Sequence, residues 1–250
     1  MILQAIILGI VQGLTEFLPV SSSGHLAILE RYFNITQPVV LAAFLHFGTF
    51  IATVVFFFKP IMDIIKGLMR GNKEAINYIL NIAIGTMPIV IFALLFTSAI
   101  EQVFTDIKLV AILLGLTGIV LLMTNIIRKQ QGNVDRLSAL IIGIGQMFAT
   151  FPGLSRSGLT ISAGFFSGVK SGEAFKFSFL LSLPAVFGAN LLELRNISVI
   201  DNYAALCVGV ACSFVSGLLA LKILHRLVHQ RFHLFGIYCL IISVLFLLVK

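Results

Sequence analysis

Six segments of this chain are apolar over about the length of a membrane span. They lie at about 39–58, 79–99, 109–127, 177–192, 204–221 and 233–249. A helix needs about 20 mostly apolar residues to cross the hydrocarbon core of a bilayer. Only 11% of the 250 residues are charged and 59% are hydrophobic, so too few polar side chains remain to cover a water-soluble domain. The sequence therefore predicts an all-α polytopic membrane protein with six spanning helices.

Two further apolar stretches are interrupted by clusters of Ser, Gly and Pro. They cover about 2–20 and 138–151, and shorter apolar pieces follow at about 24–33 and 159–169. A helix can break inside a membrane only where protein or a watery cavity satisfies its free backbone groups. We therefore predict that each stretch forms a re-entrant helical hairpin.

The two interrupted stretches look like copies of one another. They align without a gap, and the matched pairs include Gly9 with Gly143, Gln12 with Gln146, Ser21 with Ser155 and Gly24 with Gly158. We expect one integral membrane domain over 1–250, built from internal repeats at about 1–127 and 135–250. Duplicated broken helices are typical of a site formed between two halves of a membrane protein.

The distribution of Lys and Arg gives the orientation of the repeats. Basic loops at 59–73, 128–136 and 222–231 alternate with loops poor in basic residues at 30–38, 100–108 and 193–201. The positive-inside rule puts the basic loops in the cytoplasm, so the two hairpins enter from opposite sides and form an inverted-topology repeat. The net charge of +7 comes from scattered loop residues and forms no basic stripe, so we expect no nucleic-acid partner.

The first hairpin carries a carboxylate where lipid would be. Gln12 and Glu16 are four residues apart and share one face of a helix. An ionised Glu16 needs a cation, which Arg156 of the other hairpin or a hard metal ion such as Mg²⁺ or Ca²⁺ would supply. The alternative is that Glu16 binds Arg156 only to hold two helices together.

A run of hydroxyls and an imidazole follows Glu16. Ser21, Ser22, Ser23 and His25 are the ingredients of an activated nucleophile or of a set of phosphate donors. The alternative is that a serine caps the next helix and His25 is a polar anchor. We interpret His46, near the outer end of a span, as an anchor rather than a catalytic group.

The second hairpin points to an anionic ligand. Arg156 is always charged, and its planar guanidinium matches phosphate oxygens. The turn Pro152–Gly158 could add backbone N–H groups, and Ser155, Ser157 and Thr160 add hydroxyls, unless they only cap the helix. Together with a hard cation, these groups favour a phosphate or diphosphate as the ligand.

The run from Gln12 to His25 and the run from Pro152 to Thr160 resemble the two signatures of the bacterial undecaprenyl-diphosphate phosphatase family, also called the bacitracin-resistance family. The first resembles its (E/Q)xxxE motif with the serine–histidine stretch, and the second its PGxSRSxxT motif. The segment Phe177–Leu181 with Pro184 also resembles the following helix of the family. The resemblance spans essentially the whole chain. The one departure is Gln12, which the pattern permits but which removes a carboxylate.

The resemblance implies a multi-pass enzyme of the bacterial inner membrane. It would remove one phosphate from undecaprenyl diphosphate, with a divalent cation and an active site open to the outer face. The product is the lipid carrier for peptidoglycan synthesis, which links the enzyme to cell shape and to bacitracin resistance. The implied partners are the polyprenyl diphosphate and membrane lipids, and a homodimer is left open.

The resemblance also implies residue roles. The catalytic residues would be Glu16, Ser22, His25 and Arg156. The substrate would be bound by Gln12, Ser21, Ser23, Gly153, Ser155, Ser157 and Thr160. A metal ion would depend on Glu16 and Gln12. The main alternative function is a lipid-phosphate transporter or flippase, since inverted repeats with broken helices are also a transporter architecture.

Overall fold

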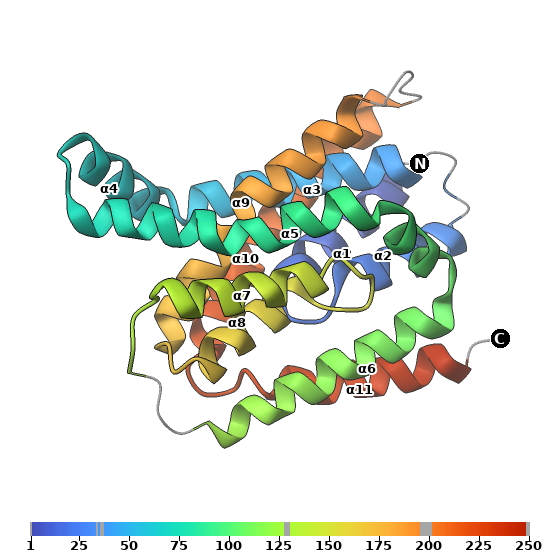
Figure 1. Cartoon of the computed structure of the whole chain (residues 1–250). Helices are drawn as coiled ribbons and strands as arrows, with labels where there is room; N and C mark the ends of the chain where they lie inside the picture. The colour runs from blue at the N-terminus through green and yellow to red at the C-terminus, as the bar shows by residue number, and fades with distance from the viewer. Residues whose placement is uncertain (1, 34, 36–37, 128–130, 196–201, 249–250) are drawn as a thin grey trace.

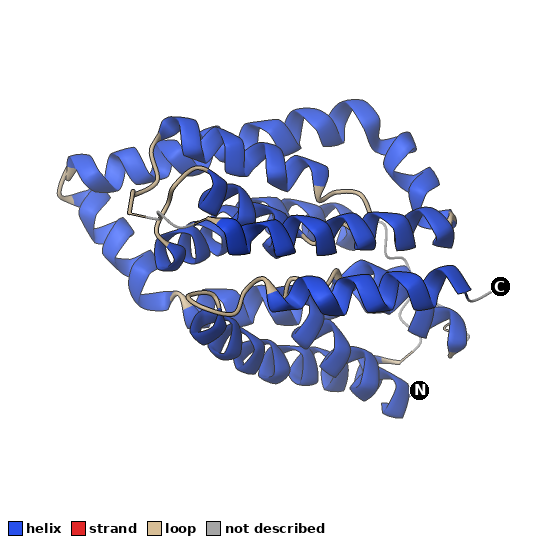
Figure 2. Cartoon of the chain, turned by 90° about the horizontal axis from the view of Figure 1, so that it is seen from below, coloured by secondary structure: helices blue, strands red, loops and turns tan. Residues whose placement is uncertain are grey.

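The computed structural model describes residues 2–33, 35, 38–127, 131–195 and 202–248, and these residues fold almost entirely as helices (Figures 1 and 2). In this part of the chain no strand forms, and a single β-bridge joins Gly132 and Val169. The helices are α1 (Ile2–Phe17), α2 (Ser22–Tyr32), α3 (Pro38–Phe56), α4 (Phe58–Met69), α5 (Lys73–Thr105), α6 (Ile107–Met123), α7 (Arg136–Phe148), α8 (Arg156–Phe166), α9 (Ser171–Arg195), α10 (Tyr203–Leu227) and α11 (Leu234–Leu248).

Four of the described helical segments are long and apolar enough to cross a membrane. They are Lys73–Phe96, Ile107–Ile126, Ser171–Leu192 and Tyr203–Leu227. A fifth is added if α3 and α4, which meet at a bend of 66°, are taken as one broken span. The all-α polytopic class is thereby confirmed. The helix at the sixth predicted segment, α11, has only 15 residues, so the total of six spans stays a prediction.

The two interrupted stretches fold as helical hairpins. The first is α1 and α2 with a break at 18–21, and the second is α7 and α8 with a break at 149–155. Helix α1 packs along α10, and α7 packs along α5. Each hairpin thus lies against a helix of the other predicted repeat. This exchange is what a two-fold repeat leads us to expect, although the repeat boundaries themselves stay a prediction.

Matched glycines allow these two helix pairs to approach closely. A Cβ atom built on Gly9 would lie 2.5 Å from the carbonyl oxygen of Gly209 in α10. A Cβ on Gly143, the repeat counterpart of Gly9, would lie 2.3 Å from the carbonyl oxygen of Gly85 in α5. Without a hydrophobic driving force in lipid, helices associate through such close backbone packing. The glycines shared by the repeats therefore set how closely each hairpin approaches its partner helix.

We expect Gly143→Ala to destabilise the protein by about 1–3 kcal/mol, because the added methyl group meets backbone that cannot swing aside. The matched control is Gly188→Ala on α9, where a Cβ meets nothing within 4 Å. That change should be neutral or stabilising by up to about 1 kcal/mol, since alanine is the better helix former. Thermal unfolding in detergent compares the two variants. Equal midpoints for both would contradict the packing argument.

A buried aromatic cluster supports the end of α1. Phe17 packs edge-on against Phe179 of α9, with ring centroids 5.6 Å apart, and Phe179 contacts Phe57 and Phe175 at 5.9 and 5.0 Å. All four rings are at most 4% exposed. Because Glu16 directly precedes Phe17, this cluster restrains the last turn of α1, where the carboxylate lies.

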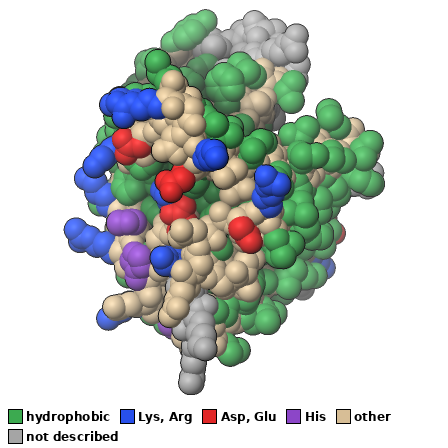
Figure 3. Space-filling model, turned by 60° about the vertical axis from the view of Figure 1, so that its left-hand side comes forward, with side chains coloured by type: hydrophobic (Ala, Val, Ile, Leu, Met, Phe, Trp, Pro, Cys, Tyr) green, Lys and Arg blue, Asp and Glu red, His purple; other side chains and the backbone are tan. Residues whose placement is uncertain are grey.

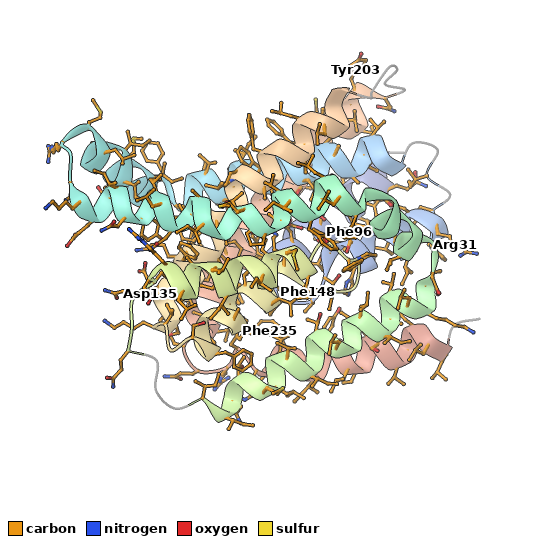
Figure 4. The ribbon with its side chains drawn as sticks, in the orientation of Figure 1. Arg31, Phe96, Asp135, Phe148, Tyr203 and Phe235 are labelled. Atoms are coloured by element: carbon orange, nitrogen blue, oxygen red, sulfur yellow. The ribbon has the colours of Figure 1, made fainter. Side chains whose placement is uncertain are left out.

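The molecule has one strongly charged end. Helix α4 and Asp135 lie at the left of Figures 1 and 4, whereas Arg31 and Tyr203 lie at the right. Figure 3 turns the left-hand side forward and shows Lys, Arg, Asp, Glu and His side chains gathered there, with hydrophobic side chains over much of the remaining surface. The basic segment 59–73, for which the sequence predicted a loop and which folds mostly as α4, therefore shares one end with the start of α7, as the predicted topology requires.

Candidate active site

An ion pair joins the breaks of the two hairpins. Glu16 stands in the last turn of α1, and Arg156 is the first residue of α8. The Arg156 Nη2 group donates to Glu16 Oε1, and the two side chains are only 18% and 9% exposed. The predicted contact between the two hairpins is therefore present in the structure. It is held by charges that would be costly to bury singly.

Three further side chains converge on the Glu16 carboxylate. Ser22 Oγ donates to Glu16 Oε2 at 2.6 Å, and Gln12 Nε2 donates to the same oxygen at 3.3 Å. His46 Nε2 lies 3.7 Å from that oxygen. Hydrogen bonds and a cation stabilise the ionised form of a carboxyl group. The site therefore holds a carboxylate next to a serine hydroxyl, inside the helical bundle.

The two matched serines at the breaks have different roles. Ser155 caps α8, because its Oγ accepts from the backbone N–H of Gly158 at 3.2 Å. Ser21 makes no such cap; it has a φ of 65° and its Oγ accepts from the backbone N–H of Gly153 at 3.1 Å. The capping alternative thus holds for Ser155 but not for Ser21, which ties one hairpin to the other. Ser23 Oγ lies 3.3 Å from Ser21 Oγ.

The turn of the second hairpin is fixed against α6. Gly153 has a φ of 94°, and a Cβ there would lie 2.3 Å from the carbonyl oxygen of Val110, so a residue without a side chain is needed. Thr117 Oγ1 donates to the Gly153 carbonyl and accepts from the Ser155 N–H, both at 3.1 Å. These bonds set the position from which α8 begins and hence the position of Arg156.

Ser157 and Thr160 lie behind Arg156. Ser157 is 2% exposed and its Oγ is 3.3 Å from that of Ser155. Thr160 is fully buried; its Oγ1 donates to the Arg156 carbonyl at 2.7 Å and lies 2.6 Å from Ser178 Oγ. The structure therefore places both hydroxyls in the packing of α8.

A cavity of about 280 Å³ opens beside the ion pair. Its lining comes from both hairpins and from α3, α5 and α9: Thr15, Glu16, Ser21, Ser22, Ser23, His46, Ile89, Gln146, Ala149, Thr150, Leu154, Ser155, Arg156, Ala185, Val186, Ala189 and Asn190. The volume is close to the lower end of the ~300–1,000 Å³ typical of ligand pockets. Six residues that the sequence singled out line it: Glu16, Ser21, Ser22, Ser23, Ser155 and Arg156. The other five do not: Gln12, His25, Gly153, Ser157 and Thr160.

His25 is turned away from this cavity. Its Nδ1 lies 2.8 Å from the Ser21 carbonyl oxygen, and because a carbonyl only accepts, Nδ1 carries the hydrogen. Its Nε2 lies 2.8 Å from the hydroxyl of Tyr238 in α11, so this nitrogen accepts from Tyr238. Both ring nitrogens are thus engaged. The structure does not bring His25 and Ser22 together as a base and a nucleophile.

The histidine beside the Glu16 carboxylate is His46 and not His25, which the sequence suggested. Its Nδ1 lies 2.9 Å from the Ala42 carbonyl oxygen, so the hydrogen is again on Nδ1 and Nε2 faces Glu16. Sequence reasoning treated His46 as an anchor and did not single out Gln146 or Asn190 as site residues. Two signals could have found them: an ionisable or amide side chain within an apolar segment is costly, and Gln146 is the repeat counterpart of Gln12.

The described residues offer a partial site for a metal ion. Among them, no group of three or more His, Cys, Asp and Glu side chains could hold a metal. Glu16 supplies carboxylate oxygens, and Gln12 Oε1 is a buried oxygen without a partner. Mg²⁺ is commonly held by one or two protein oxygens together with substrate phosphates and water. Glu16 lines the cavity and therefore fits a hard cation that is shared with a phosphate ligand, whereas Gln12 bonds Glu16 but does not line the cavity.

Comparison with known proteins identifies the family of this chain. The model of the bacitracin resistance protein BacA family matches residues 5–245. The chain belongs to the BacA family. Its BacA relatives include proteins named undecaprenyl-diphosphatase from Methanococcus maripaludis strain C7, Thermosipho africanus and Thermotoga petrophila. The chain is 42%, 40% and 37% identical to them, respectively.

These similarities extend over nearly all of each protein. The alignments cover 96% of this chain and 97% of the relative for Methanococcus and Thermosipho, and 98% and 99% for Thermotoga. The family predicted from the two motifs is thereby confirmed. The breaks of both hairpins and all residues that line the cavity fall within the BacA match.

Proposed function

We propose that this chain is an integral membrane phosphatase that hydrolyses undecaprenyl diphosphate to undecaprenyl phosphate and inorganic phosphate. The observation that carries the proposal is the cluster in which Arg156 and Ser22 bind one buried carboxylate, Glu16, beside a cavity between two broken helices. The name shared by its relatives supports the lipid diphosphate as the substrate.

The cluster supplies a nucleophile and its base. Ser22 already donates its hydroxyl hydrogen to Glu16 at 2.6 Å, so Glu16 can take that proton as the Ser22 oxygen attacks the terminal phosphorus. The bond between that phosphorus and the bridging oxygen breaks, and the lipid monophosphate leaves. Water then attacks the phosphoserine, inorganic phosphate is released, and Ser22 regains its proton.

Positive groups stabilise the charge that develops on the phosphate. Arg156 uses one nitrogen for Glu16 and has further N–H groups for phosphate oxygens. The N-terminus of α8, an 11-residue helix that begins at Arg156, adds backbone N–H groups and a favourable dipole. Hydroxyls of Ser21, Ser23 and Ser155 line the same cavity. Donors arranged before the reaction are the main source of such stabilisation.

His46 provides a proton acceptor for the cluster. Since its Nδ1 hydrogen is bound to Ala42, the Nε2 atom that faces Glu16 is free to take up a proton. It can accept the proton that Glu16 receives from Ser22 and return it later. We therefore assign to His46 the proton-transfer role that the sequence suggested for His25. His25 then acts through the backbone of Ser21.

We propose that a divalent cation, Mg²⁺ or Ca²⁺, takes part with the substrate. Glu16 would hold it together with phosphate oxygens from the cavity side, and the unpaired Gln12 Oε1 beside Glu16 is the further protein oxygen that could reach it. When bound, such an ion neutralises phosphate charge during the transfer.

The direct test is phosphate release from a long polyprenyl diphosphate by purified protein in detergent, with and without chelator. We expect release that falls when the chelator is added. The runner-up function is a lipid-phosphate transporter, which the broken helices in exchanged repeats would also suit. A pure transporter yields no phosphate in detergent, so absence of release would favour it.

Ser22→Ala should lower phosphate release by about 10²–10⁴-fold, because the covalent step loses its nucleophile. Acid quenching of wild-type protein during turnover of substrate labelled at the terminal phosphate should trap label on Ser22. Ser167→Ala is the matched control, since the Ser167 hydroxyl bonds only the backbone of its own helix. Near-wild-type release by Ser22→Ala would point to attack by water instead.

We also propose an orientation in the cell (inner) membrane. Helix α9 begins near the charged end, where Val169 bridges Gly132, and its cavity residues 185–190 lie in its second half. The positive-inside rule puts the charged end in the cytoplasm, so the cavity lies toward the outer face. There the enzyme would recycle the carrier for peptidoglycan synthesis and compete with bacitracin for the diphosphate. A homodimer stays a prediction.

A further inference from the structure

Two amide side chains in the cavity have polar atoms without a partner. Among the described residues, the buried unpaired atoms include both Nε2 and Oε1 of Gln146 and Nδ2 of Asn190. Gln146 is fully buried and Asn190 is 5% exposed, and both line the cavity. A buried polar group without a partner destabilises a protein, so its position at a cavity indicates a ligand that completes its hydrogen bonds.

Gln146 differs from its repeat counterpart, Gln12, in the groups that its amide meets. Gln12 donates an amide hydrogen to Glu16 and does not line the cavity. The position aligned with Glu16 in the second hairpin is Thr150, so Gln146 has no carboxylate to bind. Its donor is therefore free for a ligand that carries oxygen acceptors.

The charged groups that line the cavity are too few to bind all the phosphate oxygens of a diphosphate. Arg156 is the only Lys or Arg among the residues that line the cavity, and Glu16 offsets its charge. A lipid diphosphate carries several negative charges on two phosphates, so phosphate oxygens away from Arg156 and from the proposed cation at Glu16 would need other donors. Neutral N–H groups held inside a bundle stabilise such anions strongly, because the surrounding dielectric is low.

The neighbours of Asn190 indicate which phosphate it would meet. Ala185, Val186 and Ala189 of α9 and Ile89 of α5 line the same cavity and form an apolar wall suited to the start of a prenyl chain. The transferred phosphorus must lie at Ser22. The phosphate esterified to the lipid is then the one that lies on the side of this wall.

We infer that Gln146 and Asn190 form a second phosphate subsite, which binds the lipid-linked phosphate of the substrate and keeps hold of it as the leaving group. The inference rests on the proposed function. When the bridging bond breaks, the new oxyanion is on this phosphate, so the two amides would stabilise the leaving group as well as bind the substrate. The cluster around Arg156 and Ser22 then holds the terminal phosphate.

The test uses Gln146→Met and Asn190→Leu, singly and together, with a polyprenyl diphosphate as substrate. Each single change should lower kcat/KM by about 10–100-fold, the effect of losing a hydrogen bond to a charged group. Inhibition by polyprenyl monophosphate should weaken by about 10-fold or more, whereas inhibition by inorganic phosphate should stay as in wild type. The two inhibitors thus report on the two subsites separately.

Thermal unfolding separates loss of binding from misfolding in these variants. Removing an unpartnered polar group should leave the unfolding midpoint unchanged or raised. Activity that is lost while the midpoint stays the same therefore does not come from misfolding. The matched control is Ser162→Ala, since Ser162 Oγ is also buried and unpaired but does not line the cavity. Its activity and its inhibition by the monophosphate should match those of wild type.

The outcomes separate the two proposals. Wild-type protein that releases no phosphate would overturn the proposed function. An active wild type whose variants keep its sensitivity to polyprenyl monophosphate would overturn the subsite alone. Weakened inhibition by inorganic phosphate in place of the monophosphate would also overturn it, because the amides would then bind the terminal phosphate.

Discussion

Arg156→Ala is expected to lower phosphate release by at least about 10³-fold while the protein remains folded, because the guanidinium is the one Lys or Arg group that lines the cavity. Arg156→Lys should recover little of this loss, since an ammonium group cannot bind Glu16 and a phosphate with the same planar fork. Release of phosphate from a polyprenyl diphosphate in detergent measures both variants. Arg31→Ala, at the exposed end of α2, should keep wild-type activity.

Stability has to be measured alongside activity for this variant. Removing one partner of a buried ion pair costs about 3–5 kcal/mol, because the other charge is left unpaired. Uptake of a proton by Glu16 would reduce that cost. The double variant Arg156→Ala with Glu16→Gln removes the unpaired charge, so it should regain stability without regaining activity. Near-wild-type turnover by Arg156→Ala would show that the ion pair only holds the hairpins together.

Glu16→Gln should lower turnover by about 10²–10⁴-fold, the usual contribution of a general base. The amide keeps the shape of the carboxylate but cannot take the proton from the Ser22 hydroxyl. Single-turnover measurements with saturating protein isolate this chemical step from substrate binding. We expect phosphoryl transfer to be slower, with little change in the substrate concentration that half-saturates the protein.

Glu30→Gln is the matched control for Glu16→Gln. Glu30 lies on α2 of the same hairpin, is partly buried, and does not line the cavity. Its replacement should leave the single-turnover rate unchanged. If both variants slowed the reaction equally, the effect would come from the packing of the hairpin and not from proton transfer at Glu16.

His25 and His46 show where sequence reasoning stops. Ser22 and His25 are neighbours in one turn of α2, which made them look like a reactive pair. The orientation of the His25 ring is set by Tyr238, 213 positions further along the chain, and by the Ser21 carbonyl. His46 reaches Glu16 from α3, a helix that sequence proximity does not connect with the motif.

The matched serines Ser21 and Ser155 also differ in ways that their sequence does not predict. Ser21 and Ser155 are equivalent by alignment, and each precedes a helix of a hairpin. Ser155 has an N-cap backbone conformation and caps α8, whereas Ser21 has a positive φ and binds Gly153 of the other hairpin. A repeat in sequence therefore predicts a similar order of helices and breaks, but neither the backbone conformation nor the hydrogen bonds of each matched residue, because each copy meets different neighbours.

The sequence by itself determined the membrane class and the two broken hairpins, and it limited the partner of Glu16 to Arg156 or a metal ion. These follow from local rules: an apolar segment needs lipid, and a buried charge needs an opposite charge. Only the tertiary structure decided which histidine faces the carboxylate, which serine is a cap, and that Gln146 and Asn190 keep unpaired atoms at the cavity. Those outcomes depend on the directions of side chains on helices distant in the chain, and hydrogen bonds form or fail within tenths of an ångström.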